Sequence, residues 1–252
     1  MKKKIFLFLL IFSLISFPVK SFCLTRDDLE TEIRRLVADT NTDTTKQRWS
    51  SGTIVSRIEM AQLDMVSRTR CMEDVAYIDT SFNLEKYPLP SNLLVIKRVA
   101  YTTESSSSTV LFSTSSYKKI ERYTILGLDN DSTYWESLGV GLPTKYYILG
   151  SSICLVPRPS YSYSGSKRLK IVYIPRPESL DDNSDVPFNN YYYLYPYHTI
   201  ITYYVAMLCF LDERDFNLAM QYRDLYFRSL DLMVKELNSN PDWQPSFKFR
   251  NK

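Results

Sequence analysis

The stretch that decides the fold is residues 87–101, YPLPSNLLVIKRVAY, where a helical pattern gives way to a strand pattern. Its two prolines favour an extended entry, and residues 93–101 are rich in the β-branched residues that strands prefer. The sequence predicts further short strands at 110–112, 145–149, 153–156 and 169–174. Prolines at 157, 159, 175 and 177 end two of these strands, because proline donates no ladder hydrogen bond. The middle of the chain therefore predicts a small antiparallel β domain.

Helical patterns lie on both sides of this domain. Thr25 is a suitable N-cap with Asp28 as its capping-box partner, and a second helix is predicted from about residue 51 or 53 to Met72. After the acidic loop 181–187, apolar residues recur with helical spacing over about 190–211 and again from 212 or 215 to 237. The sequence thus predicts an α+β fold, in which a helical bundle built from the N- and C-terminal helices carries an inserted β domain. The expected parts are 24–84, 85–180, 187–238 and an extended tail at 239–252.

Residues 1–23 have the pattern of a secretory signal peptide. Lysines at positions 2–4 precede an apolar run at 5–17, and Ser21 and Cys23 place small residues before a cleavage point after Cys23. The run is shorter than the roughly 20 residues that a membrane-spanning helix needs. The pattern therefore indicates export to the periplasm or beyond and no stable membrane anchor once the leader is removed.

The positive charge of the chain comes from this leader. The whole chain has 31 basic and 28 acidic side chains, giving a formal net charge of +3. Residues 1–23 contain four of the lysines and no acidic residue, so 27 basic and 28 acidic side chains remain, a net charge of −1. A chain so close to neutral has no general attraction for nucleic acid, and direct nucleic-acid recognition is disfavoured.

Few residues could support catalysis. His198 is the single histidine, and its place beside Tyr197 on an apolar segment favours a packed or capping role over a catalytic one. Nucleophile-elbow, P-loop and zinc-protease motifs are absent from the sequence. We therefore expect a protein that is not an enzyme and has no cofactor, and a hydrolase ranks last among the functions considered.

Two features leave alternatives open. Residues 181–185, DDNSD, resemble the start of a calcium loop, but Val186 and Tyr192 stand where such a loop needs glycine and glutamate. An acidic turn before a helix explains the same residues, and the sequence does not decide whether the loop binds calcium. Cys71, Cys154 and Cys209 are too few and too widely spaced for a disulfide framework, so burial is favoured while a single pair stays possible.

Aromatic residues are the remaining signal. Seven tyrosines crowd residues 191–204, and consecutive positions of a helix point in different directions, so they cannot all face one core. We expect core packing for about half and a protein interface for the rest. Trp243, Phe247 and Phe249 of the tail either fold back or insert into a neighbour. The candidate partner-binding residues are Tyr191, Tyr192, Tyr195, Trp243, Phe247 and Phe249.

From Thr25 onward, the order and spacing of several segments resemble the head–tail connector (adaptor) proteins of tailed bacteriophages. The segments include the first-helix start at 25–29, Trp49 before the second helix, an Arg-Asp helix start at 214–215, and the stretches 87–90, 96–101, 141–147, 153–159 and 169–177. The resemblance implies a structural virion protein that forms a homo-oligomeric ring between portal and tail proteins. It also implies that the aromatic tail grips the portal.

The leader does not fit this family, because adaptors of this kind begin at the helix equivalent to Thr25 and assemble in the host cytoplasm. The alternative interpretation is an exported periplasmic or surface binding module with a tyrosine-rich interaction face. The sequence therefore predicts a virion location by resemblance and an exported location by its leader.

Overall fold

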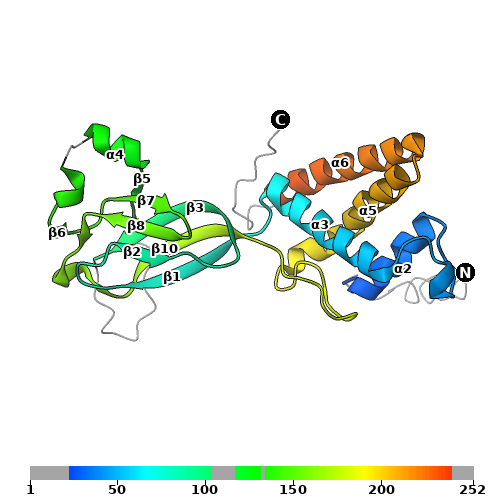
Figure 1. Cartoon of the computed structure of the whole chain (residues 1–252), viewed down its shortest axis with the longest axis horizontal. Helices are drawn as coiled ribbons and strands as arrows, with labels where there is room; N and C mark the ends of the chain where they lie inside the picture. Colours follow the sequence, from blue (N-terminus) through cyan, green and yellow to red (C-terminus); the bar gives the residue numbers. More distant parts are fainter. Residues whose placement is uncertain (1–22, 104–116, 132–133, 240–252) are drawn as a thin grey trace, which may run out of the picture. The chain divides into compact units, whose positions relative to one another are not determined.

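The computed structural model describes residues 23–103, 117–131 and 134–239 (Figure 1). Within these residues the chain forms two compact units, one made of 23–62 and 178–233 and the other of 63–177 and 234–239. Helices come from both ends of the chain and mostly antiparallel sheets from its middle, which confirms the predicted α+β class. The leader up to residue 22, the predicted strand 110–112 and the tail aromatics lie outside the described residues.

The first unit is helical. Helix α2 starts where the sequence predicts, because Thr25 and Asp28 form a reciprocal capping box. Helices α3 and α6 extend past the residues at which the two units divide. The helices are α2 (Arg26–Leu36), α3 (Ser51–Thr69), α5 (Thr199–Asp212) and α6 (Phe216–Ser239), with 3-10 turns η1 (Thr44–Lys46) and η5 (Tyr192–Tyr197).

Apolar side chains spaced three and four apart form the core of the helical unit, as amphipathic helices require. Arg34 is buried with two acidic partners, Glu30 at 2.8 Å and Asp39 at 3.0 Å. Its charge is thus paired on both sides, which a buried guanidinium needs. The fully buried apolar residues include Leu29, Ile33, Ile54, Ile58, Ile201, Val205 and Leu230.

The second unit is built on two four-stranded sheets. Sheet A has the order β1-β10-β3-β4 and sheet B the order β2-β8-β7-β5, while β6 and β9 form a small parallel pair. All pairs within the two sheets are antiparallel except β5 with β7. The strands are β1 (Asp74–Thr80), β2 (Lys86–Pro88), β3 (Leu93–Thr102), β4 (Tyr117–Lys119), β5 (Glu121–Arg122), β6 (Val140–Gly141), β7 (Lys145–Leu149), β8 (Ser152–Val156), β9 (Arg158–Pro159) and β10 (Gly165–Pro175).

Both sheets contribute to one core, because alternate residues of a strand point to the same face. Leu169, Ile171 and Tyr173 of β10 pack in the same cluster as Ile153 and Leu155 of β8. Between β7 and β8 the chain turns at Gly150, whose φ of +60° suits a residue without Cβ. The strand predictions at 93–101, 145–149, 153–156 and 169–174 are confirmed to within four residues at each end.

Several sequence predictions were wrong at their boundaries. Helix α3 stops at Thr69 instead of Met72, because Arg70 adopts a left-handed φ of 55°. No helix starts at Asn190, whose φ is 72°, and Pro196 limits the next residues to a 3-10 segment, so α5 begins only at Thr199. Strand β1 and the short helix α4 (Ile125–Asp131) were not predicted.

None of the helices among the described residues is long and apolar enough to cross a membrane.

Candidate partner-binding surfaces

The tyrosine-rich segment is a 3-10 turn placed before α5. Residues of η5 carry Pro196, whose missing N–H and fixed φ suit a short irregular segment better than an α-helix interior. Three residues per turn separate the consecutive side chains widely, so neighbouring tyrosines reach different surroundings. Leu194 and Tyr195 face the interior, whereas Tyr192 and Pro196 face solvent.

The three predicted tyrosines of this segment differ in exposure. Tyr192 exposes 71% of its surface, Tyr191 is half-buried, and Tyr195 exposes only 8%. The Tyr195 ring lies 5.4 Å from the Tyr192 ring in an edge contact, and its hydroxyl is hydrogen-bonded to the thiol of Cys23. Tyr195 therefore packs beneath Tyr192, and of the three tyrosines Tyr192 is the most exposed to solvent.

Tyrosines further along the helix belong to the core of the unit. The Tyr204 ring lies 5.1 Å from that of Tyr226, and Tyr203 lies 6.4 Å from Tyr222. These pairs join α5 to α6 through aromatic contacts. Some tyrosines of residues 191–204 therefore pack between α5 and α6, whereas others, such as Tyr192, remain at the surface.

His198 directly follows η5 in the chain and is fully buried. Its Nδ1 accepts a hydrogen bond from the Leu24 N–H at 3.2 Å, and its Nε2 donates to the Pro187 carbonyl at 3.0 Å. Burial lowers the pKa of His198 to about 4, so the ring is neutral at pH 7. Both ring nitrogens are occupied by backbone groups, which fits the packed role expected from the sequence and leaves no nitrogen for proton transfer.

The acidic loop 181–185 caps α2. The Arg26 and Asp27 N–H groups donate to the carbonyls of Asp185 at 2.7 Å and Asn183 at 3.2 Å, so the loop satisfies two free donors at the helix start. The Arg26 guanidinium also donates to the Asp181 carbonyl at 2.6 Å. Among the residues that the structure describes, no group of three or more His, Cys, Asp or Glu is placed to hold a metal ion.

No disulfide joins the cysteines that the structure describes. Cys154 lies in β8 and Cys209 in α5, while Cys71 follows the end of α3 and is not in a helix. All three are buried, as expected, and burial raises the pKa of the Cys71 thiol to about 11. These side chains are therefore protonated and pack as small apolar groups.

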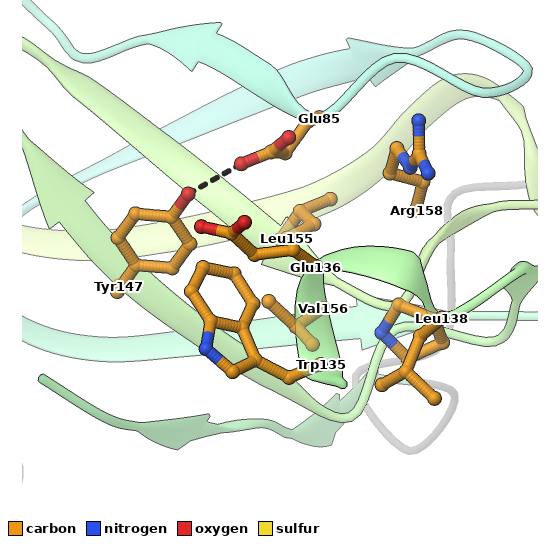
Figure 2. Close-up of a pocket in the computed structure, with 9 residues that line it drawn as sticks. Glu85, Trp135, Glu136, Leu138, Tyr147, Leu155, Val156 and Arg158 are labelled. Carbon is orange, nitrogen blue, oxygen red and sulfur yellow. Dashed lines mark hydrogen bonds between the residues drawn. The ribbon is translucent and has the colours of Figure 1, made fainter. Parts of the chain in front are cut away.

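A cavity of about 200 Å³ opens in the β unit, and sequence reasoning missed it. It lies between the 3-10 turn η3 (Trp135–Ser137) and the strands β8 and β9 (Figure 2). Its walls combine two rings, two carboxylates and a guanidinium with apolar side chains. The lining residues are Glu85, Trp135, Glu136, Leu138, Tyr147, Leu155, Val156, Pro157 and Arg158.

Hydrogen bonds fix the aromatic wall of this cavity. The Tyr147 hydroxyl donates to the Glu85 carboxylate, and the Trp135 Nε1–H donates to Asp129 at 2.7 Å. The two rings meet edge to face with centroids 5.5 Å apart. Burial, and then the contact with Glu85, raise the pKa of Tyr147, so its hydroxyl remains a donor.

The cavity could not be predicted from the sequence, because the residues that line it are far apart in the chain. Glu85 and Tyr147 are separated by 62 positions, and η3 is only three residues long. The one available signal was an isolated tryptophan beside a glutamate in a stretch to which no element was assigned.

Comparison with known protein families identifies this chain's relatives. A protein-family model described as SU10 adaptor protein matches residues 24–247. The matched region starts directly after the signal-like leader and includes both units. No curated protein matches the chain.

Proposed function

Since the chain belongs to the SU10 adaptor protein family, a family of phage head–tail adaptors, we propose that it forms a homo-oligomeric ring between portal and tail proteins. The observation that carries the proposal is the family match over residues 24–247. A phage structural adaptor acts by binding other proteins, and the buried, neutral His198 and protonated thiols are consistent with a role without catalysis.

Exposed apolar side chains supply surfaces for contacts between copies. Tyr192 is largely exposed beside the half-buried Tyr191, and α6 exposes Phe216, Met220, Leu225 and Leu232. Exposed aromatic and aliphatic side chains grouped on one unit are typical of protein interfaces. We assign Tyr191 and Tyr192 to the contact with a neighbouring copy and Tyr195 to their support.

The aromatic tail supplies the contact with the portal. Trp243, Phe247 and Phe249 lie beyond the end of α6 at Ser239, and tryptophan and other aromatics are frequent anchors of interfaces. Docking through the tail leaves both units free for contacts within the ring.

The test separates ring formation from portal binding. Truncation after Ser239, and the variant W243A/F247A/F249A, are expected to keep the oligomer of the full chain in sedimentation velocity and to lose binding to purified portal rings. Tyr192→Ala is expected to weaken the oligomer, while Tyr134→Ala, an exposed tyrosine of the other unit, leaves it unchanged. Portal binding by the truncated chain would contradict the tail assignment, and a monomeric full chain would contradict the ring.

The leader favours a second candidate, an exported binding module that uses the Tyr191–Tyr192 surface. A monomeric protein in the periplasmic fraction that binds cell-wall glycan, with loss of binding in Tyr192→Ala, would replace the adaptor proposal.

A further inference from the structure

The cavity of the β unit has the size of one side chain. Its volume of about 200 Å³ lies below the roughly 300–1,000 Å³ of sites for drug-sized ligands. A cofactor or a nucleotide does not fit such a space, whereas a long side chain of another protein does.

Its chemistry favours a cation. The carboxylates of Glu85 and Glu136 and the rings of Tyr147 and Trp135 line it together, and in the view of Figure 2 Arg158 stands across from the carboxylates. None of the ion pairs within 4.0 Å among the described residues involves Glu85, Glu136 or Arg158. The two carboxylates and one guanidinium of the lining give it a formal net charge of −1. Carboxylates beside aromatic rings combine ion pairing with cation–π attraction.

Exposed apolar side chains line the cavity or neighbour its lining residues, and we call them the rim of the cavity. Leu84 precedes Glu85 in the chain, Leu138 lines the opening, and Val140 pairs with Arg158 between β6 and β9; all three apolar side chains are exposed. Phe82 and Tyr161, with ring centroids 5.8 Å apart, are exposed next to the same strands, since the Asn83 N–H donates to the Pro159 carbonyl. An acidic slot within an exposed apolar rim matches a basic side chain flanked by apolar residues.

We propose that this cavity receives a lysine or arginine side chain from a separate partner protein, whose neighbouring apolar residues cover the rim. The choice of a separate protein rests on the proposed function, because an adaptor binds other head and tail proteins. The carboxylates hold the cation by charge, and the Trp135 and Tyr147 rings contact its alkyl stem or its charged end.

The cavity is tested on the full chain with a small probe. The protein is labelled with 5-fluorotryptophan, and the Trp135 signal, assigned with Trp135→Phe, is followed by ¹⁹F NMR during titration with N-acetyl-lysine methylamide. A saturable shift is expected, which added salt weakens. N-acetyl-norleucine methylamide, which lacks the ammonium group, is expected to give no such shift, and an equal shift with it would overturn the proposal.

Substitutions test whether the two carboxylates of the cavity bind the cation. Glu85→Gln and Glu136→Gln each are expected to weaken probe binding by up to about fivefold, the upper end for an exposed ion pair. Glu121→Gln, a control on the exposed strand β5 outside the cavity, leaves it unchanged. Undiminished binding in E85Q/E136Q would overturn the proposal.

The source of the cation is tested by sedimentation velocity. The oligomer of E85Q/E136Q is expected to equal that of the unmodified chain, and a loss of self-association would assign the cavity to a second copy and overturn the separate partner. Failure of the probe to bind would leave the ring and the portal contact of the adaptor proposal intact, so the two proposals fail separately.

Discussion

At the scale of single residues, His198 is a group whose ionisation the fold suppresses near neutral pH. Its ring is buried, and its two nitrogens are held by the Leu24 N–H and the Pro187 carbonyl. Burial moves the pKa of this ring from its ordinary 6.5 to about 4. Protonation of the folded protein would place a charge among apolar groups and remove the acceptor that Leu24 uses.

We therefore predict that acid weakens the fold through His198 as the pH falls from 6.5 towards 4. Between pH 6.5 and 4 the unfolded chain binds a proton at His198 that the folded chain does not, so the free energy of unfolding falls as pH falls. The full difference is about 3 kcal/mol by linkage. Urea unfolding at pH 6.5 and 4.5 should show about 2 kcal/mol of this difference, and His198→Gln should show a much smaller fall. An equal fall in both proteins would exclude His198 as the cause.

At the scale of elements, the start of helix α2 is fixed by its N-cap residue, Thr25. The Thr25 Oγ1 accepts the Asp28 N–H at 3.2 Å, and the Asp28 carboxylate accepts the Thr25 N–H at 2.9 Å. These two bonds satisfy donors that a helix start leaves free.

Removing the cap should destabilise the helical unit. Thr25→Ala is predicted to cost about 1 kcal/mol of unfolding free energy, because the Asp28 N–H loses its partner. The matched control is Thr31→Ala, which removes the same atoms from an exposed position inside α2 and should be neutral or slightly stabilising. Chemical denaturation followed by circular dichroism measures both. Equal stability of the two variants would show that the capping box contributes nothing.

The same elements show what the sequence could and could not predict. The Thr25 cap and the strands bounded by prolines were predictable, since capping side chains and missing N–H groups act over a few residues. The start of α5 was visible in Pro196 but was outweighed by the helical spacing of the apolar residues after it. Strand β1 was not predicted because its pairing partners in β10 lie 85 to 99 positions away, from Thr80 opposite Gly165 to Asp74 opposite Tyr173.

The candidate surfaces also differ in how much of them the sequence could predict. The exposed Tyr192 was predictable from the local density of tyrosines, although the burial of Tyr195 depends on contacts with Cys23 and His198. The cavity around Trp135 depends on residues brought together by sheet pairing, which no local pattern encodes.

At the scale of the whole molecule, the leader decides the sign of the net charge. Without residues 1–23 the formal charge changes from +3 to −1, and no residue of the family match is lost. The export interpretation predicts that the full sequence expressed in bacteria yields a product that begins at Leu24 and focuses below pH 7. N-terminal sequencing and isoelectric focusing measure this. A product that keeps Met1 and focuses near pH 8.5 would show that the leader is not removed.

The hydrogen bond between Leu24 and His198 also has a consequence for synthesis. Its two residues lie 174 positions apart. At about 5–20 residues per second, His198 is therefore synthesised roughly 10–35 s after Leu24, and the bond can form only after that. The core strands of the β unit, which end at β10, are synthesised before α5. During that interval, the apolar faces of α2 and α3 lack the helices that bury them in the finished protein. The nascent chain therefore offers these faces to chaperones until its last helices emerge.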